Sequence, residues 1–60
     1  MNEQDLINKM QRTRLDIEID VLQSFQVELE LEGITGGKTE YLLNKEIHSR
    51  IEKLREIENV

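Results

Sequence analysis

The sequence contains no cysteine, no proline and no tryptophan, and its aromatic residues are limited to Phe25 and Tyr41. Without cysteine, the chain has no disulfide and no thiolate metal ligand, and its single histidine, His48, excludes a zinc site built from several imidazoles. Two aromatic side chains provide no platform on which nucleic-acid bases stack. We therefore expect no cofactor and no metal.

Positive charge is also scarce, because eight lysine and arginine residues are set against thirteen acidic residues, which gives a net charge of −5. Phosphate binding needs a basic surface, so this balance argues against direct contact with nucleic acid or with an anionic membrane. No apolar run approaches the roughly 18 residues of a membrane span, and residues 2–5 do not resemble a signal peptide. We expect a cytoplasmic protein whose partner is another protein, of basic character.

The length of 60 residues allows one small domain, which we take as residues 1–60. Below roughly 70–80 residues a single core seldom supplies more than about 3–5 kcal/mol of stability. Disulfides and structural zinc are excluded here, so association with a second chain is the remaining means of reinforcement. The expected assembly is a homodimer.

The segment 15–31 fits two secondary structures, and the first is a β-hairpin. Its odd positions are largely apolar and its acids take even positions, which is typical of half-buried strands. The loop would be Leu22-Gln23-Ser24, which lacks the residues that favour tight turns, and Glu18 would lie opposite Glu28. This alternative predicts an α+β protein, a helix–β-hairpin–helix dimer.

The second template for this segment is a helix, which we favour over residues 2–32. Spacings of four, three, three and four residues place one apolar stripe on a single face, formed by Leu15, Ile19, Leu22, Phe25 and Leu29. A second stripe lies roughly opposite and consists of Leu6, Met10, Ile17, Val21 and Leu31. Asn2 is the expected N-cap, with Glu3 and Asp5 in the first turn. A helix that is apolar on two faces packs on both of them.

Residues 33–38 predict a glycine-rich turn, in which Gly33 ends the first helix in the left-handed conformation. The turn does not match a phosphate-binding loop, because Lys38 stands where that motif requires glycine. Residues 39–58 predict a second helix, with Thr39 as its expected cap and with Leu43, Ile47, Ile51 and Leu54 along one face. The predicted fold is therefore all-α, a two-helix antiparallel hairpin that assembles as a homodimeric helical bundle.

Particular side chains are expected to build this assembly. The predicted core and dimer interface consists of Leu15, Ile19, Leu22, Phe25, Leu29, Ile47, Ile51 and Leu54. Arg50 lies at the edge of the second helix's stripe, and it either extends to solvent or pairs with an acid of the first helix. His48 and Glu52 are four residues apart, but two ligands do not make a metal site, so we interpret His48 as an ordinary surface residue.

Six acidic residues are the candidates for contact with a partner: Asp16, Glu18, Asp20, Glu28, Glu30 and Glu32. Three interpretations of these acids are open. They form an ordinary solvated surface, they steer a basic partner, or they imitate nucleic-acid phosphate in the basic cleft of a DNA- or RNA-binding protein. We favour a small acidic protein-binding regulator, inhibitor or assembly adaptor of bacterial or phage type, and not an enzyme.

The segment 43–48 reads Leu-Asn-Lys-Glu-Ile-His. It resembles the signature Ser-Gln-Glu-Leu-Asp, preceded by an apolar residue, of small helical-hairpin phosphatases that act on aspartyl-phosphate response regulators in sporulating bacteria. Glu46 and Ile47 agree in type, whereas Asn44 and His48 replace the serine and the aspartate. The resemblance implies a helical hairpin and offers response-regulator dephosphorylation as an alternative function. The aspartate carries much of that family's activity, which puts catalysis by this chain in doubt.

Overall fold

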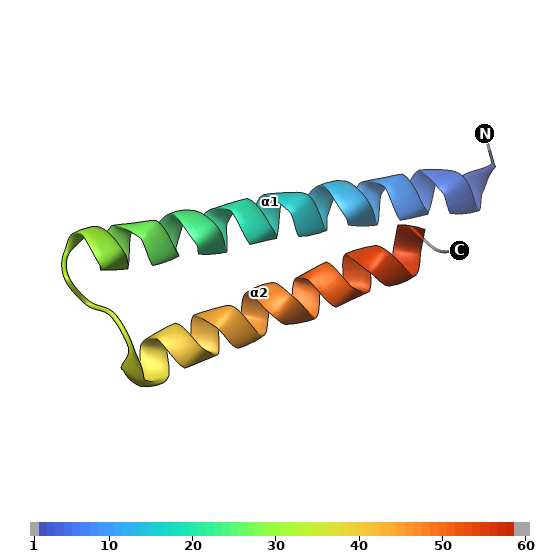
Figure 1. Ribbon diagram of the computed structural model, residues 1–60. Coiled ribbons are helices and arrows are strands. Elements are labelled where there is room, and N and C mark those ends of the chain that lie inside the picture. The colour runs from blue at the N-terminus through green and yellow to red at the C-terminus, as the bar shows by residue number, and fades with distance from the viewer. Residues whose placement is uncertain (1, 59–60) are drawn as a thin grey trace.

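The computed structural model describes residues 2–58 and consists of two helices, α1 (Glu3–Leu31) and α2 (Gly37–Glu58). The helices run in opposite directions and pack against each other as a hairpin (Figure 1). None of the described residues forms a strand, which confirms the all-α prediction and shows that the α+β alternative is wrong. In the helix Glu18 and Glu28 are about 15 Å apart along the axis, so the like-charge pairing of a β-hairpin is avoided.

The first turn of α1 has the cap that the sequence predicts. The Asn2 side-chain oxygen accepts a hydrogen bond from the Asp5 backbone N–H at 2.8 Å. Glu3 and Asp5 add negative charge where the helix dipole favours it. The predicted boundaries 2 and 32 are therefore the two cap residues, and the helix itself spans Glu3–Leu31.

The end of α1 is closed by a Schellman motif around Gly33, whose φ is +81°. The Gly33 N–H donates to the Glu30 carbonyl at 3.0 Å, and the Ile34 N–H donates to the Leu29 carbonyl at 2.8 Å. Ile34 also lines a small hollow with Leu29 and Leu43, which is the apolar contact that accompanies this motif. The prediction that Gly33 ends the helix in the left-handed conformation is confirmed.

The second helix starts two residues earlier than predicted, at Gly37 instead of residue 39. The Glu40 carboxylate accepts a hydrogen bond from the Gly36 backbone N–H. The backbone of the helix offers this N–H no acceptor, so the Glu40 side chain supplies one. Gly36 and Gly37 both have positive φ, 77° and 76°. Glycine tolerates this backbone, so the chain reverses direction before Lys38 and needs no cap at Thr39.

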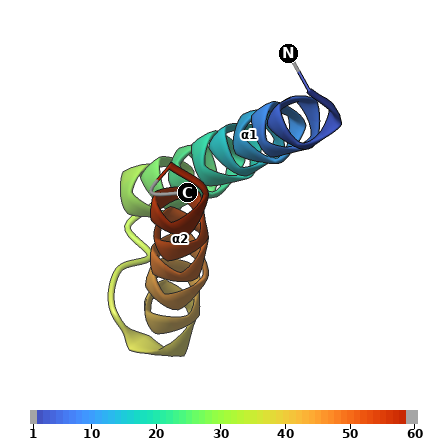
Figure 2. The ribbon, with the colours of Figure 1, turned by 90° about the vertical axis from the view of Figure 1, so that its right-hand side faces the viewer.

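The two helices do not lie flat against each other along their whole length. Figure 2 shows that they cross at an angle and that the N-terminal turns of α1 diverge from α2. The side chains that are buried lie on both helices: Ile19 at 9% exposed, Leu43 at 8% and Ile47 at 8%. The core of one hairpin is therefore small.

The helices also differ in length. At 1.5 Å per residue, the 29 residues of α1 extend about 44 Å and the 22 residues of α2 about 33 Å. The N-terminal end of α1 consequently extends beyond the end of α2 (Figure 1). Leu6 and Met10 lie on this extension and are 51% and 64% exposed.

Candidate protein interface

The side of α1 that faces α2 is called here the inner face and is formed by Leu15, Ile19, Leu22 and Leu29. Ile19 is buried, and the other three are half-buried. On α2 the predicted residue Ile47 is buried, whereas Ile51 and Leu54 are half-buried. Leu43 is also buried, and its place at the start of the α2 stripe is the sequence signal for it.

Phe25 has a different environment from the rest of its stripe, because it is 48% exposed. Its spacing relative to Leu22 and Leu29 places it at the edge of the inner face, about 70° from the centre of that stripe. It lines a shallow hollow together with Val21 and Ser24, away from α2. Phe25 is thus available to a second molecule.

The opposite side of α1 is called here the outer face and is formed by Leu6, Met10, Ile17 and Val21. These four side chains are between 51% and 64% exposed, and Leu31, the remaining residue of the second stripe, is 82% exposed at the end of α1. With Lys9, Thr13 and Arg14, the first three line an open groove of about 690 Å³. The outer face is therefore a continuous apolar strip that α2 does not cover, with charged side chains along its borders.

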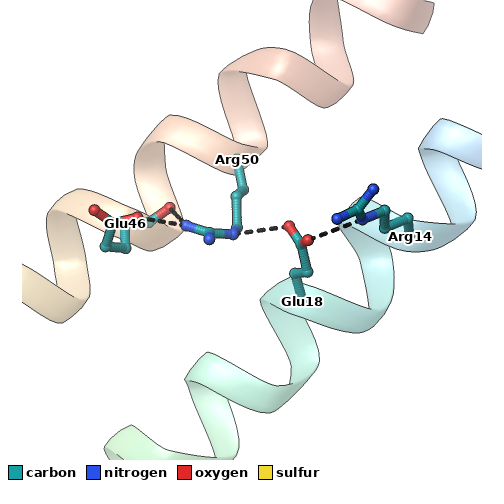
Figure 3. Close-up of polar contacts among 4 residues, drawn as sticks. All are labelled: Arg14, Glu18, Glu46 and Arg50. Carbon is teal, nitrogen blue, oxygen red and sulfur yellow. Dashed lines mark hydrogen bonds and ion pairs between the residues drawn. The ribbon is translucent and has the colours of Figure 1, made fainter.

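A cluster of four charged side chains joins the two helices (Figure 3). Arg50 Nε on α2 contacts Glu18 Oε2 on α1 at 3.0 Å, and Arg50 Nη1 contacts Glu46 Oε2 at 2.6 Å. Arg14 approaches the other oxygen of Glu18, with its Nε at 3.4 Å from Oε1. Of the two alternatives considered for Arg50, the structure has the second, in which it pairs with an acid of the first helix.

Protonation equilibria in this cluster follow from its contacts. The hydrogen bond from Arg50, followed by the positive charge of Arg50, holds the pKa of the Glu46 carboxyl below its ordinary value. Hydrogen bonds to Glu46 and then to Glu18 raise the pKa of the Arg50 guanidinium. Both groups therefore stay ionised near neutral pH.

Two further polar contacts connect the helices on either side of this cluster. Gln26 Nε2 donates to Asn44 Oδ1 at 2.6 Å near the turn, and Arg12 Nη2 lies 3.7 Å from Glu58 Oε1 near the open end. Polar pairs at three levels of the hairpin specify one register of α2 on α1. They add specificity, because exposed ion pairs contribute little stability.

The six predicted partner-facing acids do not have equivalent surroundings. Glu18 belongs to the charged cluster and is half-buried. The other five are exposed and form no ion pair within residues 2–58: Asp16, Asp20, Glu28, Glu30 and Glu32. The charges of these five acids are therefore not neutralised within the described part of the hairpin.

The residues considered as metal ligands or as catalytic groups form ordinary surface contacts. His48 Nε2 lies 3.1 Å from Glu52 Oε1, and no group of three or more potential metal ligands occurs in residues 2–58. Asn44 accepts the bond from Gln26, and Glu46 accepts the bond from Arg50. Of the positions that resemble the phosphatase signature, Ile47 is buried and Asn44 bonds to α1, whereas Glu46 and His48 contact other side chains of α2.

Comparison of this chain with protein-family models, with curated proteins and with solved structures found no match in any of the three. Within residues 2–58, neither helix combines the length and apolar character needed to cross a membrane. The exposed surface of the hairpin, above all the outer face of α1, is therefore the main indication of function.

Proposed function

We propose that this protein acts by binding other protein chains, as a homodimer of helical hairpins, and that it serves as a regulator, inhibitor or assembly adaptor. The observation that carries the proposal is the outer face of α1, where four large apolar side chains are exposed in one strip. Contiguous apolar strips with polar borders mark protein interfaces on soluble proteins. Covering this strip removes the apolar surface from water and is the main source of binding energy.

A second copy of the same chain is the first partner that we propose. One hairpin buries Ile19, Leu43 and Ile47 within residues 2–58, and a core of this size is too small to hold a 60-residue fold by itself. The sequence offers no disulfide as a substitute. Pairing of two outer faces supplies the missing apolar contact and produces a four-helix assembly.

A further partner of basic character is proposed for the acidic part of α1. The exposed acids Glu28, Glu30 and Glu32 lie near the turn, and no basic side chain is present in the last turn of the helix. Glu28 and Glu32 share one side of the helix because they are four residues apart, whereas Glu30 points to the opposite side, so the three acids form no regular row. This distribution favours attraction of a basic protein over imitation of a regular row of phosphates.

The proposed assembly is tested by the mass of the protein in solution at two concentrations, with light scattering on a sizing column. The expected result is a species of twice the 7.1 kDa chain mass that gives way to single chains on dilution. A single-chain mass at both concentrations, with helical circular dichroism retained, would contradict the homodimer. The basic partner is tested by the binding of a lysine-rich peptide to the same sample. We expect the substitutions Glu28→Gln, Glu30→Gln and Glu32→Gln to weaken that binding.

The competing hypothesis is the phosphatase activity that the resemblance at residues 43–48 implies. We expect no such activity, because His48 replaces the aspartate of the signature. The measurement is the decay of a phosphorylated response regulator with and without this protein. A faster decay that is lost in Glu46→Gln or His48→Ala would overturn the proposal in favour of an enzyme.

A further inference from the structure

The outer face of α1 has an internal symmetry that reveals how a second copy fits it. The spacings from Leu6 to Met10, from Met10 to Ile17 and from Ile17 to Val21 are four, seven and four residues. This pattern reads the same in both directions along the helix. When two such helices run antiparallel, Leu6 lies opposite the partner's Val21, and Met10 lies opposite the partner's Ile17.

The charges at the borders of the outer face select this antiparallel orientation. Lys9, Asp16 and Asp20 lie along one border, since they are separated by seven and four residues. In an antiparallel pair with a two-fold axis, equal borders meet, so Lys9 lies between the partner's Asp16 and the partner's Asp20. Each of these acids is then about 3 Å from Lys9 along the helix axis.

The parallel orientation would give the opposite result. Parallel helices bring unequal borders together, at positions about five residues apart. Lys9 would then face the partner's Arg14, and two positive charges would repel each other. The antiparallel pair also brings Arg14 near the partner's Arg14, but only this orientation places each Lys9 between two acids. The balance of charges therefore favours the antiparallel pair.

The position of α2 leaves room for this arrangement. The outer face is about 140° around α1 from the centre of the inner face, according to the helical repeat. A partner α1 on the outer face therefore does not collide with α2. Near the centre of the pair, Arg14 lies close to the partner's Arg14, and each is paired with Glu18 of its own chain.

We infer that a second copy of this chain docks antiparallel on the outer face of α1, with the two-fold axis between Thr13 and Arg14. This inference rests on the proposed homodimer and specifies its interface. The two α1 helices form the centre of the assembly, and each α2 lies on the outside. The N-terminal extension of each α1 then has a function, because Leu6 covers Val21 of the other chain.

Disulfide trapping tests this interface well, because the natural chain contains no cysteine. The variants Met10→Cys, Ile17→Cys and Thr13→Cys each place one thiol on or beside the outer face. Lys45→Cys, at an exposed position on α2, is the control for random oxidation. Each protein is first checked for helicity in reducing buffer and then equilibrated in a glutathione redox buffer, singly and in pairs.

A mixture of Met10→Cys and Ile17→Cys should give a mixed disulfide in roughly tenfold excess over either homodimer, because only these two thiols are held close together. Thr13→Cys should cross-link with itself, since it adjoins the two-fold axis. Met10→Cys alone should cross-link poorly, because its two thiols are about 10 Å apart along the axis. Lys45→Cys should show only the background.

The contrary outcomes separate this inference from the proposed function. Efficient self-cross-linking of Met10→Cys would overturn the antiparallel orientation. A dimeric mass with no cross-linking above the Lys45→Cys background would overturn this interface and leave the homodimer in place. A single-chain mass for the natural protein would contradict the homodimer and the inference together.

Discussion

The inner and outer faces of α1 belong to the same helix and carry similar apolar side chains, yet their surroundings differ completely. Ile19 on the inner face is 9% exposed, and Val21, only two residues later on the outer face, is 62% exposed. Helical periodicity separates the two faces but does not decide which of them α2 covers. The closing turn and the polar pairs between the helices decide that, and they leave the other face exposed to solvent.

The largest expected effect of a substitution is on the inner face. Ile19→Ala removes a buried side chain at the contact of the two helices and should cost about 2–5 kcal/mol. For a hairpin with so small a core, that loss should remove the cooperative thermal transition followed by circular dichroism. An unchanged transition would mean that the inner face does not hold the fold. Leu22→Ala should cost less, because Leu22 is only half-buried.

A charged substitution on the outer face should act on association instead of folding. Ile17→Glu places a carboxylate within the apolar strip and should weaken the dimer at least tenfold, or about 1.4 kcal/mol. Val27→Glu is the matched control, because Val27 is 53% exposed on the same helix but lies outside both faces. Sedimentation of the two variants over a concentration series distinguishes them. Equal dissociation constants would show that the outer face has no special part in assembly.

A charge exchange at the border of the outer face should have a smaller effect that can be reversed. Lys9→Glu should weaken the dimer, because a third acid then joins Asp16 and Asp20 at the proposed contact. The double variant Lys9→Glu with Asp20→Lys should recover part of the loss. Pairs of this kind are typically worth about 0.2–1 kcal/mol, so the comparison belongs at low salt, where screening is weakest. Additive effects of the two changes would show that these residues do not meet.

The smallest expected effect concerns pH and the charged cluster. The pKa of Glu46 is lower in the folded chain than its ordinary value of 4.5. Its contribution to stability is therefore fully present above pH 4.5 and is lost as the pH falls through the lower, folded value. The raised pKa of Arg50 keeps the guanidinium charged throughout that range. The difference in melting temperature between pH 6 and pH 3 should therefore be smaller for Glu46→Gln than for the natural chain.

Much of the hairpin could be predicted from the sequence, because its signals are local. Asn2 before two acids, Gly33 after an apolar run, and the spacing from Leu43 to Ile47 each specify a cap or a face within a few residues. The position of Arg50 at the border of its stripe allowed a pair with an acid of the first helix, and the structure identifies that acid as Glu18. Helix ends and helix faces depend on interactions between residues that are close in the sequence, so they can be predicted without a structure.

The extent of burial could not be predicted in the same way. Phe25 has the spacing of an inner-face residue, but its exposure depends on the angle at which α2 crosses α1. Similarly, the early start of α2 depends on the reach of Glu40 back to Gly36, a contact that competes with the expected cap at residue 39. Crossing angles are set by the packing of whole helices, whereas the choice between two caps depends on which nearby side chain reaches the free backbone N–H.

The small core of the hairpin also links the abundance of this protein to its survival in the cell. A hairpin held by so few buried side chains opens often, and each opening exposes its backbone to proteases. Any molecule that binds the folded form alone reduces the open population in proportion to its concentration. If the protein binds a partner as proposed above, the lifetime of the chain should therefore rise with the supply of that partner.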